Sequence, residues 1–149
     1  MPQIHAQAAA TIDAPAEIVY YILADYQVGH PAILPKPYFT GISVEQGGRG
    51  AGTVIKTRMN VMGAERTFYM TVAEPQPGRV LVESDGTTTT TFTVEPLGKG
   101  TCRVTIATNT RPSPGLQGWI ESLFSPPFLR RVYRQELENL AEYAQRPNS

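Results

Sequence analysis

The 149-residue sequence has only one cysteine, Cys102, and only two histidines, His5 and His30. A single cysteine excludes an internal disulfide. The cysteine and the histidines show none of the spacings of zinc sites, so we expect neither a metal nor another cofactor. The sequence also lacks the phosphate-binding loops GxGxxG and GxxxxGK and the GxSxG turn of serine hydrolases. No catalytic residue is therefore assigned from a motif.

An excess of charge of either sign is also missing, because 13 Lys and Arg residues balance 13 Asp and Glu residues and the sequence pI is about 6.7. Without a basic face, nucleic acid is not an expected partner. No apolar run is long enough to cross a bilayer, and the N-terminal residues lack the basic start of a signal peptide. We therefore expect residues 1–149 to form one cytoplasmic domain without stable membrane insertion. The sequence does not indicate whether the protein has a protein partner.

Short turns rich in glycine and proline divide the middle of the sequence into strands. The stretch "GGRGAGT" (47–53) joins two of these strands and opens no helix, so we interpret it as a hairpin turn and not a nucleotide-binding loop. Turns this short indicate antiparallel neighbours. Two short helices are expected between the first two strands. The predicted strands, which make a seven-stranded sheet, are 3–12, 39–46, 53–61, 66–74, 79–84, 87–95 and 101–109.

Alternation along these strands separates an apolar face from a solvated face. In an antiparallel sheet with one wet face, every second residue points toward the core. For the strand expected at 79–84, this sorting places Val80 and Val82 inward and Arg79, Leu81 and Glu83 outward. The inward residues of the other strands are Ile42, Val44, Ile55, Thr57, Met59, Val61, Phe68, Met70, Val72, Thr88, Thr90, Phe92, Val94, Cys102, Val104, Ile106 and Thr108.

The C-terminal part of the chain is the long element that can cover the apolar face. Apolar residues recur at helical spacing from about Pro114 to about Tyr143. Ser125 and Pro126 each precede a proline, which disfavours helical backbone, so we expect a break at Pro126 and Pro127. We interpret residues 114–124 as a lid over a cavity; the alternative is a bend that only follows the curvature of the sheet.

Four segments in this order resemble the helix-grip fold of the START-like superfamily, which includes the birch-pollen-allergen-like proteins. Within this superfamily, the segments resemble the polyketide cyclase/dehydrase-like branch and the related coenzyme Q-binding proteins. The resemblance implies an α+β fold in which a curved sheet grips the long C-terminal helix, with a cavity between them. It brings no transferable catalytic motif. The segments are "ATIDAPAEIVYYILADY" (10–26), "GGRGAGTVIKTRM" (47–59), "TTTFTVEPLGKGTCRVTI" (89–106) and "FLRRVYRQELENLAEYA" (128–144).

We predict that this cavity binds a ligand, although a filled core is the alternative for a face so rich in Ile, Val and Phe. Methionines adapt to irregular volumes, and inward threonines are costly in a dry core without partners. We place His30, Tyr38 and Phe128 at the cavity mouth. The predicted ligand-binding residues are Ile55, Thr57, Met59, Phe68, Met70, Val82, Thr90, Phe92, Val104, Ile106, Trp119, Leu123 and Phe124.

The pattern favours binding or carriage of a hydrophobic small molecule, such as a lipid, a quinone or a polyketide-like compound. The inward face contains hydroxyls but no assigned carboxylate or histidine, and hydroxyls are weak acid–base groups without an activating partner. Asp25, His30 or Tyr38 can still reach in from a loop. The first alternative is therefore a polyketide cyclase/dehydratase-type enzyme acting in the same cavity, which an acid–base pair inside it would favour. A further alternative is a module that presents a lipid or quinone to a partner.

Overall fold

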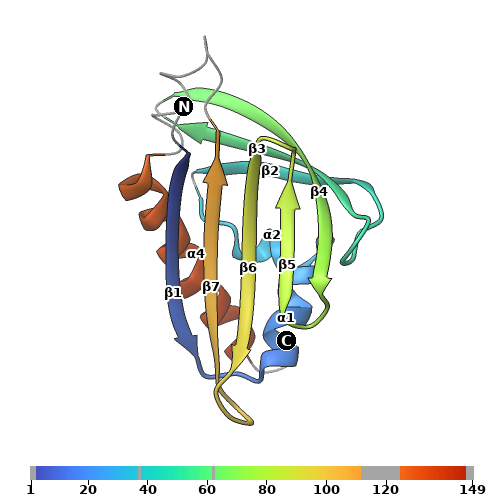
Figure 1. Ribbon diagram of the computed structural model, residues 1–149, viewed down its shortest axis with the longest axis vertical. Coiled ribbons are helices and arrows are strands. Elements are labelled where there is room, and N and C mark those ends of the chain that lie inside the picture. The colour runs from blue at the N-terminus through green and yellow to red at the C-terminus, as the bar shows by residue number, and fades with distance from the viewer. Residues whose placement is uncertain (1–2, 37, 62, 112–124, 147–149) are drawn as a thin grey trace.

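The computed structural model describes residues 3–36, 38–61, 63–111 and 125–146. These residues form an α+β fold with the expected order of one strand, two short helices, a six-strand meander and a long helix (Figure 1). The helices are α1 (Ala16–Ala24), α2 (Gly29–Ile33) and α4 (Pro126–Gln145). The strands are β1 (Ile4–Ile12), β2 (Phe39–Gln46), β3 (Val54–Val61), β4 (Ala64–Gln76), β5 (Val80–Ser84), β6 (Thr88–Pro96) and β7 (Cys102–Thr110). The predicted helix-grip fold is confirmed.

All seven strands belong to one antiparallel sheet with the order β1-β7-β6-β5-β4-β3-β2. The first strand therefore lies beside the last, while the other neighbours are consecutive hairpins, as short turns require. The sheet is strongly curved: β2 and β3 cross the view of Figure 1 at a steep angle to β1 and β7. This curvature makes the concave face that α4 and the short helices cover.

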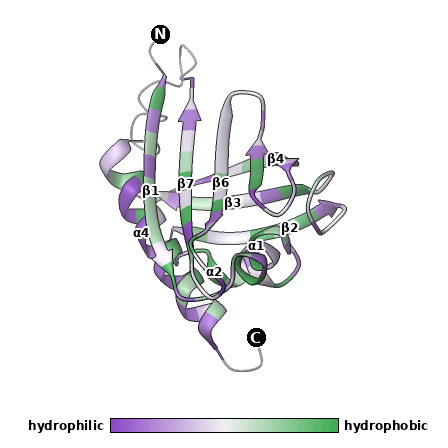
Figure 2. Cartoon of the chain, turned by 60° about the horizontal axis from the view of Figure 1, so that its bottom comes forward, coloured by the Kyte–Doolittle hydropathy of each residue, from purple (hydrophilic) through white to green (hydrophobic). Residues whose placement is uncertain are grey.

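Helix α4 packs on the concave face beside β1 and contacts α1 and α2. Its buried residues recur at intervals of three and four, the spacing of one helix face. Hydrophilic and hydrophobic residues also alternate along the strands in Figure 2, as expected for a sheet covered on one side. The buried residues of α4 are Leu129, Val132, Tyr133, Glu136, Leu137 and Leu140.

The predicted inward face is correct on β3, β4, β6 and β7, but the prediction for β5 is wrong. Leu81 is fully buried, while Val80 and Val82 are only partly buried. The β5–β6 register explains this, because Leu81 pairs with the inward residue Phe92, and Glu83 pairs with the inward residue Thr90. The register shift in the β4–β5 pairing next to Val80 accompanies the change of face. Glu83, expected in solvent, therefore faces the interior.

Helix α4 begins where the proline pair predicts a boundary. Ser125 has extended backbone (φ −61°, ψ 135°), and Pro126 is the first helical residue. The Ser125 side chain makes no capping hydrogen bond. The predicted lid at 114–124, with Trp119, Leu123 and Phe124, lies outside the described residues, so the lid stays a prediction.

The β5 register predicts a difference between two neighbouring truncations. Leu81→Ala should lower the free energy of unfolding by about 2–5 kcal/mol, because it leaves a cavity in a filled interior. Val82→Ala should cost clearly less, since Val82 is half-buried on the opposite face. Urea denaturation of both variants measures this, and an equal or larger cost at Val82 would contradict the register.

Candidate functional site

A cavity of about 80 Å³ lies on the concave face, at the end of the sheet away from β1 and β7. It is enclosed by β2–β6, α4 and the segment around α2. Most of the wall is apolar or aromatic, and the polar groups are few, which is typical of small-molecule sites. The lining residues are His30, Leu34, Phe39, Ile42, Ile55, Thr57, Met59, Phe68, Met70, Glu83, Thr88, Thr90, Phe92, Leu129, Val132, Tyr133 and Glu136.

Seven residues predicted to bind a ligand line this cavity: Ile55, Thr57, Met59, Phe68, Met70, Thr90 and Phe92. Val104 and Ile106 are fully buried on β7 but do not line it. Val82 lies on the opposite face of β5 because of the register described above.

The three residues predicted at the cavity mouth have different positions. His30 is a buried part of the cavity wall, only 2% exposed. Tyr38 and Phe128 pack edge to face against each other, with ring centroids 5.3 Å apart, and neither lines the cavity.

The short connection between α1 and α2 places His30 in the wall. The Asp25 carboxylate accepts a hydrogen bond from the Gln27 backbone N–H (3.1 Å), and the Asp25 backbone carbonyl accepts one from the His30 N–H (2.8 Å). Gly29 permits the close turn: a Cβ there would lie 2.7 Å from the backbone oxygen of Ile22. Any side chain at this position would push α2, and with it His30, away from α1.

Hydrogen bonds to neighbouring elements hold the same connection. The Tyr26 N–H donates to the Gly48 carbonyl (2.9 Å) in the loop between β2 and β3. The Asn139 side-chain amide of α4 donates to the Ile33 carbonyl at the end of α2 (3.0 Å). His30 is thus fixed relative to both the sheet and α4.

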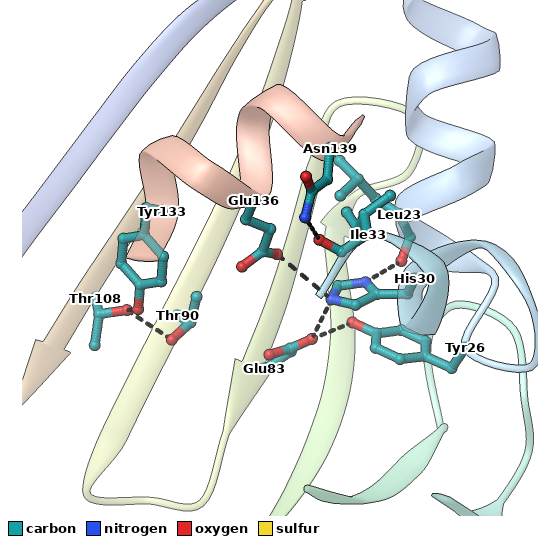
Figure 3. Close-up of polar contacts among 10 residues, drawn as sticks. All are labelled: Leu23, Tyr26, His30, Ile33, Glu83, Thr90, Thr108, Tyr133, Glu136 and Asn139. Carbon is teal, nitrogen blue, oxygen red and sulfur yellow. Dashed lines mark hydrogen bonds and ion pairs between the residues drawn. The ribbon is translucent and has the colours of Figure 1, made fainter. Parts of the chain in front are cut away.

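The imidazole of His30 faces two carboxyl groups (Figure 3). Its Nδ1 donates to the Leu23 backbone carbonyl (2.7 Å), since a carbonyl oxygen can only accept. Nε2 therefore faces the cavity side, 3.6 Å from Glu83 Oε2 and 3.9 Å from Glu136 Oε2. The Tyr26 hydroxyl donates to Glu83 Oε2 (2.6 Å), and the Tyr26 ring stacks on the imidazole. The backbone bond fixes Nε2 as the atom that can exchange a proton.

Glu136 is the unusual member of this group. It is 2% exposed, and among the described residues its Oε2 is a buried side-chain oxygen without a hydrogen-bond partner. Burial raises the pKa of its carboxyl group well above the ordinary value, and the nearby charge of Glu83 raises it further. Burial thus favours the protonated form of Glu136, and this form can donate a proton into the cavity.

A second polar group in the wall consists of three hydroxyls. Thr108 Oγ1 is hydrogen-bonded to the Tyr133 hydroxyl and, at 2.8 Å, to Thr90 Oγ1 (Figure 3). Burial raises the pKa of Tyr133 above its ordinary value, so the phenol stays protonated. Thr88 is paired in the same way with Thr110 (2.6 Å). The inward threonines thus satisfy one another across β6 and β7, and their presence does not by itself require a ligand.

Sequence reasoning missed Glu83, Tyr133 and Glu136. A signal for the last two was available, since both lie at helical spacing with Leu129, Val132 and Leu137 and so share the buried face of α4. Glu83 was hidden by the short apolar run Val80–Leu81–Val82, in which alternation cannot distinguish the two faces. Within the described residues, no cluster of His, Cys, Asp and Glu is arranged to hold a metal ion.

The arrangement can move protons within an apolar enclosure. Burial favours the protonated form of Glu136, which can give a proton, while His30 Nε2, 3.6 Å from Glu83 Oε2, can accept one. A proton donor and a proton acceptor that lie this close together can act as acid–base partners. The site thus brings two carboxyl groups to the inward face, where sequence reasoning had assigned none. No helix in the described part of the chain is long and apolar enough to span a bilayer.

Solved structures support the fold. The chain is 30% identical to the KanY protein, covering 98% of this chain and 100% of that one with a TM-score of 0.83. It also superposes on the ZhuI aromatase/cyclase from Streptomyces sp. R1128 (17% identity, 97% and 95% covered, TM-score 0.76). A START superfamily protein from Mycobacterium smegmatis gives 17% identity, 93% and 92% coverage and a TM-score of 0.60. The latter two likenesses show the fold alone.

The search of curated proteins found no match to this chain. Residues 3–145 match the sequence profile of a family described as polyketide cyclase / dehydrase and lipid transport. This match covers nearly the whole chain, and it agrees with the helix-grip fold and with a cavity between sheet and helix. The chain therefore belongs to the polyketide cyclase / dehydrase and lipid transport family.

Proposed function

We propose that the protein binds a small hydrophobic carbonyl compound in the cavity and catalyses cyclase/dehydratase-type proton transfer on it. The observation that carries this proposal is the buried Glu136 carboxyl, whose Oε2 has no hydrogen-bond partner among the described residues and lies 3.9 Å from His30 Nε2 in the wall of an apolar cavity. Burying such a group is costly for stability alone. Perturbed acids in a cavity are typical of functional sites.

The proposed reaction follows from which group accepts a proton and which group donates one. His30 Nε2 removes a proton from the carbon next to the substrate carbonyl, and the neighbouring Glu83 carboxylate stabilises the imidazolium that forms. Glu136 gives its proton to the oxygen on the next carbon, which leaves as water while a carbon–carbon double bond forms. His30 takes one proton from the substrate and Glu136 gives one to it, so the substrate loses one molecule of water and the step is balanced. Aldol-type ring closure uses the same pair, with protonation of the attacked carbonyl.

The size of the cavity limits the ligand. Sites for drug-sized ligands measure about 300–1,000 Å³, whereas this one measures about 80 Å³. The described conformation therefore suits one ring or a comparable chain. Carriage of a hydrophobic small molecule without catalysis, the function that the sequence favoured, is supported by the apolar wall. Carriage alone gives no role to the proton of Glu136.

A binding experiment tests the cavity first. Benzalacetone, an uncharged one-ring ketone, should bind with a Kd no lower than about 0.2 mM, since burying about 200 Å² at about 25 cal/mol per Å² contributes about 5 kcal/mol before the cost of ordering the ligand. Met70→Glu should abolish binding, because it places a charge on the apolar wall. Tyr69→Glu is the control, as Tyr69 is exposed on the other face of β4. Calorimetry measures both; binding that survives in folded Met70→Glu would place the ligand elsewhere.

A kinetic experiment tests the chemistry. The protein should accelerate loss of water from the β-hydroxyketone formed from benzaldehyde and acetone, followed by the absorbance of benzalacetone. Glu136→Gln and His30→Gln should each lower kcat by about a hundredfold or more, because each removes a proton-transfer group. Glu138→Gln, exposed on the outer side of α4, should not change it.

The outcomes separate enzyme from carrier. Wild-type protein that binds benzalacetone but dehydrates the hydroxyketone no faster than buffer would contradict the enzymatic proposal and favour carriage. Equal rates for wild type and both site variants would contradict the assigned roles of His30 and Glu136.

Protonation of Glu136 is expected to affect how the free energy of unfolding depends on pH. The folded state holds this proton at pH values where the unfolded carboxyl, with an ordinary pKa of 4.5, has released it. The unfolded state then binds fewer protons, so this group lowers stability as the pH rises above 4.5. Glu136→Gln removes the effect, while Glu83 and His30 remain.

The free energy of unfolding of Glu136→Gln minus that of wild type should therefore increase with pH above this value. Urea denaturation over a pH series measures the difference, with Glu138→Gln as control. Parallel curves for wild type and Glu136→Gln would show that Glu136 is not held protonated.

A further inference from the structure

The hydroxyl chain Tyr133–Thr108–Thr90 has one more hydrogen than its hydrogen bonds use. Three hydroxyl groups carry three hydrogens, and the two bonds through Thr108 engage two of them. Thr108 is the middle member, and the two ends, Tyr133 and Thr90, both line the cavity. When Thr108 accepts from one neighbour and donates to the other, the remaining hydrogen belongs to Tyr133 or Thr90 and can be donated to an acceptor in the cavity.

This donor lies beside the proposed acid, Glu136, and beside Glu83, which supports the proposed base. Tyr133 precedes Glu136 by three residues on α4, and residues at this spacing are neighbours on one helix face. Thr90 is the direct cross-strand partner of Glu83, and paired residues on one face of a sheet have Cβ atoms about 4.5–5.5 Å apart. The hydroxyl chain thus connects the helix that carries the acid to the strands that support the base (Figure 3).

We propose that the Tyr133 and Thr90 hydroxyls bind the carbonyl oxygen of the ligand and stabilise the enolate formed from it. The ligand class is then a small ketone with a second oxygen on the β-carbon, a β-hydroxyketone or β-diketone, and not a hydrocarbon-like lipid. The inference rests on the proposed function for the site and adds the group that fixes the orientation of the ligand.

The electrons move toward this donor. As His30 takes the proton, the carbon–hydrogen electron pair forms the enolate double bond, and the carbonyl pair moves onto the oxygen held by the hydroxyl chain. The electron pair on this oxygen then re-forms the carbonyl group. The carbon–carbon double bond moves to lie between the α- and β-carbons, and the β-oxygen leaves as water with the proton from Glu136. A donor aimed at the oxygen where charge develops lowers the barrier of this step.

Ligand binding tests the proposal without turnover. Acetophenone and ethylbenzene differ in one carbonyl oxygen, and their Kd values can be measured by ligand-observed NMR. Tyr133→Phe should change the ratio of the two Kd values by about tenfold, through weaker binding of acetophenone alone. The carbonyl stretch of isotope-labelled acetophenone should lie at lower frequency in the wild type than in Tyr133→Phe. An unchanged ratio and frequency would overturn the proposal.

Thr90→Val provides a second variant if Tyr133→Phe does not fold, with the same expected direction. Thr110→Val is the matched control, because it removes an equivalent buried Thr–Thr hydrogen bond between β6 and β7 without altering a lining residue. The control should leave both the ratio and the frequency unchanged. A loss of selectivity in Thr110→Val as large as in Tyr133→Phe would show a merely structural role.

Kinetics distinguish this proposal from the proposed function. With the β-hydroxyketone, Tyr133→Phe should lower kcat by about a hundredfold while KM changes much less, since the donor acts mainly on developing charge. Dehydration by the wild type with full activity in Tyr133→Phe would overturn the carbonyl site and leave the acid–base pair. Carbonyl selectivity without any dehydration would support the site and contradict the enzymatic function.

Discussion

Burial of the apolar stripe of α4 against the concave face is the constraint on which the other features depend. Leu129, Val132, Leu137 and Leu140 are each at most 2% exposed, and burying one such side chain contributes about 1.5–3 kcal/mol. Glu136 lies between them on the same face. The stripe thus supplies the free energy that holds a carboxyl group away from water, and burial in turn favours the protonated form of that group.

The same apolar stripe of α4 divides the space between α4 and the concave face of the sheet into two parts. Next to β7, large side chains such as Val104 and Ile106 are completely buried and the space is filled. Farther along, β2 and β3 cross at a steep angle to β1 and β7 (Figure 1), and the cavity lies on the concave face of β2–β6. The location of the cavity is therefore a consequence of sheet curvature.

The overall fold was predictable because alternation and turn chemistry act locally. Seven strands, the antiparallel meander and the helix boundary at Pro126 all follow from patterns a few residues long. The face of β5 was not predictable, since Val80, Leu81 and Val82 are equally apolar and the register comes from pairing with β6. Tyr133 and Glu136 were within reach of the helical period, but their meeting with His30 depends on how α1, α2 and α4 pack.

The hydrogen bond between His30 Nδ1 and the Leu23 carbonyl has a consequence for the fate of hydrogen atoms at the site. It prevents the imidazole from turning over, and the rings of Tyr26 and Phe92 cover the imidazole on two sides. A hydrogen transferred to Nε2 from a bound molecule therefore cannot be carried to bulk water by rotation of the ring. Until the molecule departs, the hydrogen can move only back to that molecule or onto the carboxyl groups of Glu83 and Glu136, which lie beside Nε2. A deuterium label on the reacting carbon is thus expected to be returned to unreacted molecules, and not washed out into the solvent.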